Sequence, residues 1–330
     1  MNSDRNRTVD VLKGIAIIFV LFTHYEWTPE QRKIFIFPYV INMSIPIFMI
    51  ISGYVYSLSQ SKKEIHHLED AYDKSILINR FIRYSVPLLV LIIWELLDPH
   101  FSISARPPLH LLKWGIDGTY GKGNYYYPVL LQLVIVFPII YYIIETNKEK
   151  GLLICFVLNA MYELLVWAYG MNTECYRLLV FRYIFLIAAG AFAFNKYRIG
   201  VFKSILFTIL GALFIYFITY QKYNTKILNS DWASTSFIAS LVIVPIMIWI
   251  LQNVNLHFWP LEFIGKASYH IFLVQMVYYL GYYSVLQNVF LIWQVHLLMG
   301  MVICIVAGCI FYYVDRPIQS KLKLLITRIH

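Results

Sequence analysis

The sequence has few charged residues. Asp, Glu, Lys and Arg together make up 14% of its 330 residues, whereas soluble globular domains contain about 25%. Hydrophobic residues account for 60%, and the mean hydropathy is +0.64. This composition excludes an ordinary soluble domain and predicts an integral membrane protein.

Cysteines are also few, and their spacing is typical of neither a metal site nor a disulfide framework. The four are Cys155, Cys175, Cys304 and Cys309. We therefore expect no metal. No low-complexity or repeated segment is visible, and no cleavable signal peptide is expected because the first apolar stretch lacks a small-residue cleavage site. The net charge of +9 is explained by orientation in the membrane, so we expect no nucleic-acid partner.

Apolar runs, in contrast, are abundant, and a helix crosses a bilayer with about 20 such residues. We predict an all-α bundle of ten transmembrane helices, at residues 9–27, 36–58, 84–98, 125–145, 151–169, 178–194, 201–220, 233–252, 268–286 and 291–314. No remaining segment is long enough for a second domain, so residues 1–330 are expected to form a single membrane domain.

The basic residues divide unequally between the two sides of this bundle. With the N-terminus inside, about two thirds of the 27 Lys and Arg residues fall in inner segments, Lys150 among them, while Arg32 and Arg177 fall in outer loops. Cytoplasmic segments carry such an excess of Lys and Arg. The pattern therefore predicts that both termini are cytoplasmic.

Three ionisable residues, Asp10, Lys13 and His24, interrupt the first apolar run. On an α-helix the spacing from Lys13 to His24 corresponds to about 16.5 Å and about three turns, so they share one stripe, with Asp10 within about 40° of it. An ionisable residue at membrane depth costs about 2.5–3.5 kcal/mol and usually faces the bundle interior or a wet cavity. The stripe predicts a buried polar site. The alternative for His24 is a helix-end histidine that bonds a neighbouring helix or interfacial water.

Five short motifs follow one another along the chain. They are Arg7-Thr-Val-Asp10-Val-Leu-Lys13-Gly14 followed by His24, Pro46-Ile-Phe48-Met-Ile-Ile-Ser52-Gly53-Tyr54, Arg80-Phe-Ile-Arg83 followed by Pro87, Gly265-Lys266-Ala-Ser268-Tyr269, and Asp315-Arg316-Pro317. Together they resemble the membrane acyltransferase-3 (polysaccharide O-acyltransferase) family, in its order and over nearly the whole chain. The chain departs from the family at Val274-Gln275, where members often carry a Trp-His pair.

The resemblance implies an O-acetyltransferase of a multi-pass type, in a bacterial plasma membrane and surrounded by its lipids. The implied donor is cytoplasmic acetyl-coenzyme A, and the implied acceptor is a hydroxyl of a cell-surface polysaccharide or of its lipid-linked precursor. A hydroxyl needs a base to become a good nucleophile, so His24 is the predicted general base. Lys13 and Asp10 are predicted to line the donor path. The oligomeric state is left open.

Arg80 and Arg83 lie one helical turn apart, and the planar fork of arginine suits phosphate groups. We predict that they hold the donor phosphates, with Lys266 as a third contact. The alternative for the arginines is ordinary anchoring at lipid headgroups. Gly265 and Ser268 around Lys266 also fit a simple helix start.

Four further residues are candidates for substrate binding: Glu95, Tyr126, Glu163 and Arg182. Arg182 lies mid-helix and must find a carboxylate or a cavity, because its isolated burial is too costly. Glu163 and Glu95 are the natural partners, and a structural ion pair explains them as well as a substrate contact does. Tyr126 suits stacking on a sugar, although tyrosines also anchor proteins at membrane interfaces.

Two other function classes are compatible with buried charges in a helical bundle. A lipid-linked glycan transporter or flippase is favoured by an inverted repeat, and we find no convincing one. A non-enzymatic membrane scaffold would tolerate the loss of His24. Consumption of acetyl-coenzyme A with release of a free thiol separates the enzyme from both.

Overall fold

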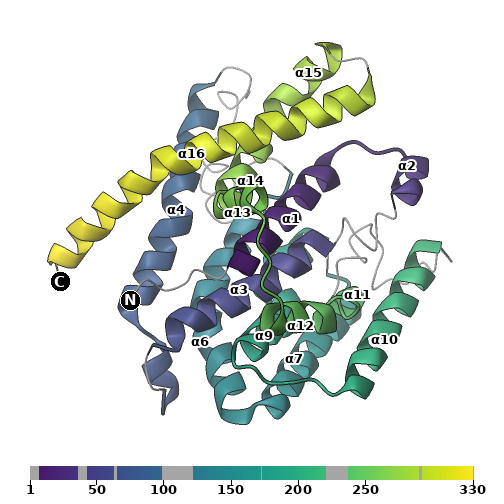
Figure 1. The fold of residues 1–330 in the computed structure, drawn as a ribbon, viewed down its shortest axis with the longest axis vertical. Coiled ribbons are helices and arrows are strands. Elements are labelled where there is room, and N and C mark those ends of the chain that lie inside the picture. Colours follow the sequence, from purple (N-terminus) through teal and green to yellow (C-terminus); the bar gives the residue numbers. More distant parts are fainter. Residues whose placement is uncertain are drawn as a thin grey trace.

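The computed structural model describes residues 7–35, 43–62, 65–98, 122–171, 173–220, 237–289 and 292–329, and these form helices and turns without a strand (Figure 1). The first half contains α1 (Arg7–His24), α2 (Pro29–Ile34), α3 (Ser44–Gln60), η2 (Leu68–Ala71), α4 (Lys74–Leu97), α6 (Tyr126–Asn147) and α7 (Glu149–Ala168). The second half contains α8 (Thr173–Leu178), η4 (Val180–Tyr183), α9 (Ile184–Phe194), α10 (Val201–Tyr220), α11 (Phe237–Ser240), α12 (Val244–Asn253), α13 (Trp259–Lys266), α14 (Ser268–Val277), η7 (Tyr278–Tyr282), α15 (Tyr283–Val289) and α16 (Trp293–Ile329).

Within these residues, four helical segments are long and apolar enough to cross a membrane, judged by length and composition alone. They are Leu68–Leu97, Tyr126–Asn147, Glu149–Ala168 and Trp293–Leu324, and the shorter apolar helices are Val180–Phe194, Val201–Phe217 and Val244–Asn253. These seven overlap seven of the predicted spans, whereas α1, α3 and α14 with α15 account for the other three. The starts of the predicted spans at residues 36, 233 and 291 lie outside the described residues. The all-α class is therefore confirmed, and the count of ten spans stays a prediction.

The candidate spans differ in how far they are covered by protein. In α6, 61% of the apolar window is buried, but only 28% in α4 and α16. Apolar residues that protein does not cover in a membrane protein are suited to lipid contact. The long helix α16 accordingly crosses the outside of the helix group in Figure 1, and α6 belongs to its interior.

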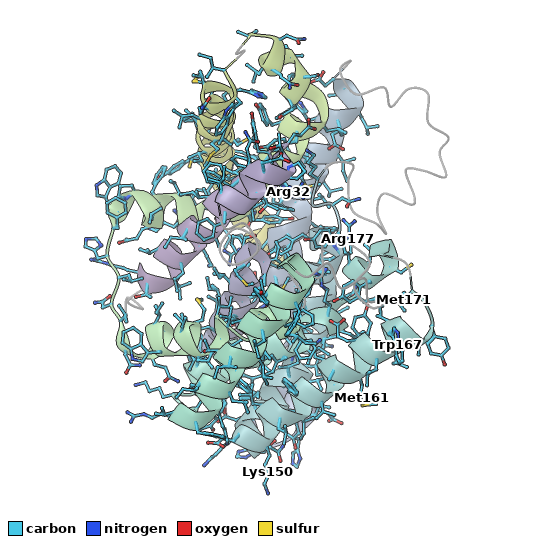
Figure 2. The ribbon with its side chains drawn as sticks, turned by 90° about the vertical axis from the view of Figure 1, so that its right-hand side faces the viewer. Arg32, Lys150, Met161, Trp167, Met171 and Arg177 are labelled. Carbon is cyan, nitrogen blue, oxygen red and sulfur yellow. The ribbon has the colours of Figure 1, made fainter. Side chains whose placement is uncertain are left out.

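Helix α7 has an outward apolar side of the same kind. Met161 and Trp167 are about half exposed, and Figure 2 shows them along α7 above Lys150. Arg177 and Arg32 lie farther up, at levels well separated from Lys150 (Figure 2). This separation agrees with the opposite sides predicted for these basic residues, and the orientation in the membrane stays a prediction.

Two helix crossings are close enough to require glycine. Helix α1 crosses α13 at Gly14 and Gly265, where a β-carbon on Gly265 would stand 1.8 Å from the carbonyl oxygen of Asp10. One on Gly14 would stand 2.4 Å from that of Leu261. Small residues allow such close approach of helix backbones. Two of the sequence motifs therefore contain the glycines that fix α1 against α13.

Helix α3 crosses α9 in the same manner. A β-carbon on Gly53 would stand 2.0 Å from the carbonyl oxygen of Ile187, and one on Gly190 would stand 1.9 Å from that of Ile50. The glycine of the Ser52-Gly53-Tyr54 motif is thus a packing residue. The crossing fixes the face of α3 that carries Phe48, Ser52 and Tyr56.

Two predicted boundaries are wrong. Helix α4 begins at Lys74 rather than residue 84, because the Asp73 side chain accepts a hydrogen bond from the backbone N–H of Ile76 (3.0 Å) and caps the helix there. Arg80 and Arg83 consequently lie inside α4 and not before it. Helix α1 ends at His24, earlier than the predicted residue 27, so His24 occupies its last position.

Candidate functional site

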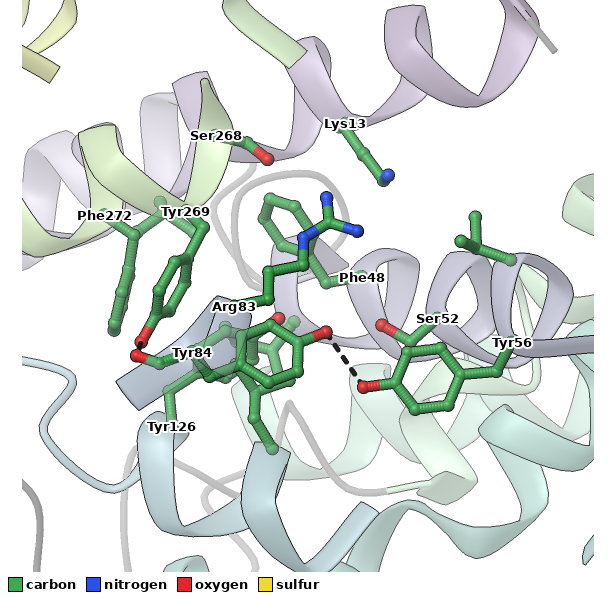
Figure 3. A pocket seen from close by; sticks show the side chains of 14 residues that line it. Lys13, Phe48, Ser52, Tyr56, Arg83, Tyr84, Tyr126, Ser268, Tyr269 and Phe272 are labelled. Carbon is green, nitrogen blue, oxygen red and sulfur yellow. Dashed lines mark hydrogen bonds between the residues drawn. The ribbon is translucent and has the colours of Figure 1, made fainter. Parts of the chain in front are cut away.

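A cavity of about 70 Å³ lies between helices α1, α3, α4, α6 and α14. Its lining residues are Lys13, Val20, Ile45, Phe48, Ser52, Val55, Tyr56, Arg83, Tyr84, Tyr126, Leu130, Ser268, Tyr269 and Phe272 (Figure 3). Four of the five sequence motifs contribute to this lining. Residues far apart in the chain therefore meet around one space, because the glycine crossings draw α1 and α3 to their neighbours.

The cavity holds two cationic side chains. Figure 3 shows Lys13 pointing into it from α1 and Arg83 from α4, with their charged ends toward the same space. None of the described lining residues is acidic. Arg83 is exposed, so it marks the open side of the cavity. Lys323 on α16 lies close enough to Arg83 for the two positive charges to interact. Two cations facing one space favour an anionic ligand there.

Tyrosines form much of the remaining wall. The hydroxyl groups of Tyr56 and Tyr84 lie 2.8 Å apart, and the Tyr269 hydroxyl donates to the backbone carbonyl of Tyr84 at 2.9 Å (Figure 3). Tyr126 packs its ring 5.0 Å from that of Phe272. These contacts connect α3, α4, α6 and α14 around the cavity and hold its aromatic wall in place.

Arg80 has a different environment from Arg83. It is buried, its guanidinium group donates to the backbone carbonyl of Tyr56 at 3.1 Å and to the hydroxyl of Ser59, and its central carbon lies 3.6 Å from the centre of the Tyr56 ring. Arg80 therefore links α4 to the C-terminal part of α3, whose last carbonyls favour a cation. Of the two arginines, only Arg83 lines the cavity.

His24 lies at the far end of α1 and is held by α14. Its Nδ1 atom is 2.5 Å from Oε1 of Gln275, and its backbone carbonyl accepts a hydrogen bond of 2.9 Å from Lys122. The ring of Tyr279 stands edge-on at 6.0 Å, from the π-helical turn η7. Within the described part of the chain, Nε2 of His24 has no hydrogen-bond partner.

Gly123 and Phe272 connect the cavity to His24. Phe272 lines the cavity, and a β-carbon on Gly123 would stand 3.0 Å from the Phe272 ring and 3.3 Å from Cε1 of His24. Gly123 also has φ +101°, a conformation that favours glycine. The cavity thus extends along α1 from Lys13 to Val20, one helical turn before His24, and Phe272 of its lining and His24 both lie beside Gly123.

Asp10 and Lys266 do not line the cavity. Asp10 is buried where α1 meets α13. Lys266 ends α13 and lies within electrostatic range of Glu262. The pKa of the Glu262 carboxyl is lowered first by its hydrogen bond with His257, with smaller contributions from Arg7 and Lys266.

Glu163 and Arg182 come together in a separate cluster between α7 and η4. Tyr176 donates a 2.7 Å hydrogen bond to Glu163, and the guanidinium carbon of Arg182 lies 4.6 Å from the Tyr176 ring centre. Arg182 is fully buried and within electrostatic range of Glu163. Glu95 is buried in α4. Of the four predicted substrate-binding residues, only Tyr126 lines the cavity.

A second histidine contacts the Asp315-Arg316-Pro317 motif. Nε2 of His270 lies 2.7 Å from the carboxylate of Asp315, and both side chains are buried. The amide of Gln319 donates to the same carboxylate. This pair joins α14 to α16 one residue away from Tyr269, so it fixes the helix that carries Phe272 and Gln275.

Several residues of the site had no clear sequence signal. Lys122 and Tyr84 belong to no motif. Gln275 is visible in the sequence as an intramembrane polar residue, but its contact spans 251 positions, which no periodicity reveals. Among the described residues, no group of three or more His, Cys, Asp and Glu side chains is gathered as a metal site requires.

One of three comparisons with known proteins identifies the family of the chain. A family profile described as Acyltransferase domain matches residues 6–313, nearly the whole chain. No match was found among curated proteins or solved structures. The matched region contains α1, the cavity, His24 and its partner Gln275, and it ends two residues before the last motif. The chain belongs to the membrane acyltransferase-3 family.

Proposed function

We propose that the protein transfers an acetyl group from cytoplasmic acetyl-coenzyme A to a hydroxyl of a cell-surface polysaccharide or of its lipid-linked precursor. The observation that carries the proposal is the cavity lined by Lys13 and Arg83, which runs along α1 toward His24. Family membership supplies the acyl-transfer chemistry. Helix α1 contributes both the cation Lys13 and the proposed base His24.

The cationic end suits the donor. Coenzyme A carries phosphate groups, and Lys13 and Arg83 offer positive charge at the open side of the cavity. A cavity of about 70 Å³ is much smaller than the roughly 300–1,000 Å³ of a typical small-molecule site. It therefore suits the narrow acyl-pantetheine arm, with the nucleotide outside near Arg83. Lys266 and Arg80 are proposed as outer contributors of positive charge, since neither lines the cavity.

The base acts at the other end. Nε2 of His24 takes the proton of the acceptor hydroxyl while the hydroxyl oxygen forms a bond to the thioester carbonyl carbon. The tetrahedral intermediate then collapses, the carbon–sulfur bond breaks, and the coenzyme A thiolate leaves and takes up the proton held by His24. Phe272 lines the cavity and lies beside Gly123, as His24 does, so its ring borders the path by which the acyl group would reach the acceptor hydroxyl.

The test uses the full-length protein in lipid nanodiscs with radiolabelled acetyl-coenzyme A and envelope glycans extracted from cells that lack this gene. We expect release of free thiol that depends on the glycan, with label recovered in the glycan. His24→Gln protein is the matched control. Glycan binding or movement by wild-type protein without thiol release would overturn the proposal in favour of a transporter.

A further inference from the structure

We infer that Gln275 is a positioning residue that sets the tautomer of His24 and so leaves Nε2 as the basic nitrogen. The inference rests on the proposed function, in which His24 is the base. It concerns a residue that touches neither the cavity nor, in this geometry, a substrate. Its role follows from two hydrogen bonds made by one side-chain amide.

The first hydrogen bond joins Oε1 of Gln275 to Nδ1 of His24 at 2.5 Å, and the second runs from Nε2 of Gln275 to the backbone carbonyl of Lys122 at 3.0 Å. Gln275 is fully buried. A buried amide whose oxygen and nitrogen both have partners is held in one orientation.

The backbone carbonyl of Lys122 decides which end of the amide faces which partner. A carbonyl oxygen can only accept a hydrogen bond, so the NH₂ group of Gln275 must face Lys122. The reversed amide would place two acceptor oxygens against each other. Oε1 is therefore left facing the imidazole ring, and it too can only accept.

The proton of the neutral imidazole must then lie on Nδ1. A neutral imidazole has one N–H and one lone pair, so Nε2 of His24 holds the lone pair that a general base needs. Serine-hydrolase triads hold their histidine in the same tautomer through a carboxylate. Here a neutral amide does so, and its orientation is set by a backbone carbonyl.

The surrounding contacts hold the imidazole ring of His24 beside Gln275. Lys122 donates to the backbone carbonyl of His24 at 2.9 Å and forms a 3.5 Å ion pair with Glu26. The same residue thus fixes the backbone of His24 through its side chain and the amide of Gln275 through its carbonyl. Tyr279 donates to the carbonyl of Leu21 at 3.0 Å and holds its ring beside the imidazole.

Two variants with side chains of similar length distinguish the role of Gln275 as a hydrogen-bond acceptor for Nδ1 of His24 from its role in packing. Gln275→Met removes the acceptor, so the proton is free to move to Nε2. We expect kcat to fall, by less than the roughly 10²- to 10⁴-fold that loss of the base itself costs, at unchanged KM for acetyl-coenzyme A. Gln275→Glu keeps an acceptor for the Nδ1 proton, as the carboxylate of a serine-hydrolase triad does, but sets its second oxygen against the Lys122 carbonyl. It should therefore lose stability and still retain far more activity per folded protein than the methionine variant. Gln252→Met is the matched control, since Gln252 bonds the backbone carbonyls of Ala193 and Tyr197 away from the site.

The tautomer is read directly by nitrogen NMR of histidine-labelled protein, with the His24 signals assigned by their loss in His24→Gln. We expect a protonated Nδ1 and an unprotonated Nε2 in the wild type, and a proton on Nε2 in Gln275→Met. A wild-type proton on Nε2 overturns the inference even if the enzyme is active and the variants fold poorly. Equal kcat in Gln275→Met and wild type also overturns it. A protonated Nδ1 in a protein that does not use acetyl-coenzyme A would refute the proposed function and leave the tautomer assignment standing.

Discussion

Two groups of polar residues among the apolar helices of this molecule look alike in the sequence and differ in the structure. In the region along α1, the cations Lys13 and Arg83 face a cavity whose described lining holds no acid. In the cluster between α7 and η4, Glu163, Tyr176 and Arg182 contact or face one another. The first region lines a cavity, and in the second the polar side chains contact one another.

The difference shows that a buried ionisable residue is not by itself a sign of a binding site. Burial of a charge requires compensation, and a neighbouring side chain provides it as well as a ligand does. What distinguishes the α1 region is that cations of one sign, from different helices, surround a space. We therefore propose that the α1 region acts on substrates and that the α7–η4 cluster stabilises the fold.

The largest effect is expected at His24. General-base catalysis contributes about 10²- to 10⁴-fold in rate, so His24→Gln should lower kcat by about that factor at unchanged donor affinity. Glutamine preserves much of the size and hydrogen bonding but accepts no proton at neutral pH. Turnover of acetyl-coenzyme A and donor binding by calorimetry measure the two quantities separately. Wild-type turnover in this variant would reduce His24 to a packing residue.

Substitutions in the α7–η4 cluster should lower stability rather than turnover. Removing one member of a buried charged group costs about 3–5 kcal/mol, so Arg182→Met should strongly lower the thermal stability of the solubilised protein. Glu163→Gln, which keeps an acceptor for Tyr176, should lower it less. Donor affinity should stay unchanged in whatever fraction is folded. A weaker affinity at wild-type stability would instead make the cluster a substrate site, as the sequence also allowed.

The alignment of Lys13 with His24 was predictable from the sequence because both lie on one helix. The 3.6-residue period alone aligns Lys13 with His24, and the structure keeps both on α1. The same argument cannot separate Arg83 from Arg80. Which of them reaches the cavity depends on how α4 lies against α3, where the Tyr56 carbonyl and the Ser59 hydroxyl hold Arg80.

The fold was predictable in class and less so in detail. Hydropathy identified the helices but not where they end, since ends depend on local contacts such as the Asp73 cap. The motif residues Gly14 and Gly265 contribute close packing rather than chemistry. Gln275 was unpredictable as a partner of His24, because hydrogen bonds between distant segments leave no local pattern in the chain.

Lys13 and the two arginines of α4 provide the next test. Lys13→Met should weaken acetyl-coenzyme A binding by about 1.5–3 kcal/mol, the range for a hydrogen bond to a charged group. Arg83→Met should have a smaller effect, because its exposed charge is screened by solvent. Arg80→Met should lower stability instead, since it removes the link to Tyr56 and Ser59. Loss of affinity in Arg80→Met at unchanged stability would restore the direct phosphate contact predicted from the sequence.

The smallest effect is expected at the tyrosine wall. Tyr84→Phe removes the 2.8 Å hydrogen bond with the Tyr56 hydroxyl and keeps the ring, the backbone carbonyl that accepts from Tyr269, and both cations. A neutral hydrogen bond contributes about 0.5–1.5 kcal/mol to stability, so the melting temperature should fall slightly while donor affinity and kcat stay near wild type. If the wall only shapes the cavity, kcat in Tyr84→Phe must stay far above that in His24→Gln. A loss of turnover as large as that of His24→Gln would mean that the hydroxyl pair of Tyr56 and Tyr84 takes part in proton transfer. The tyrosine wall would then belong to the catalytic groups.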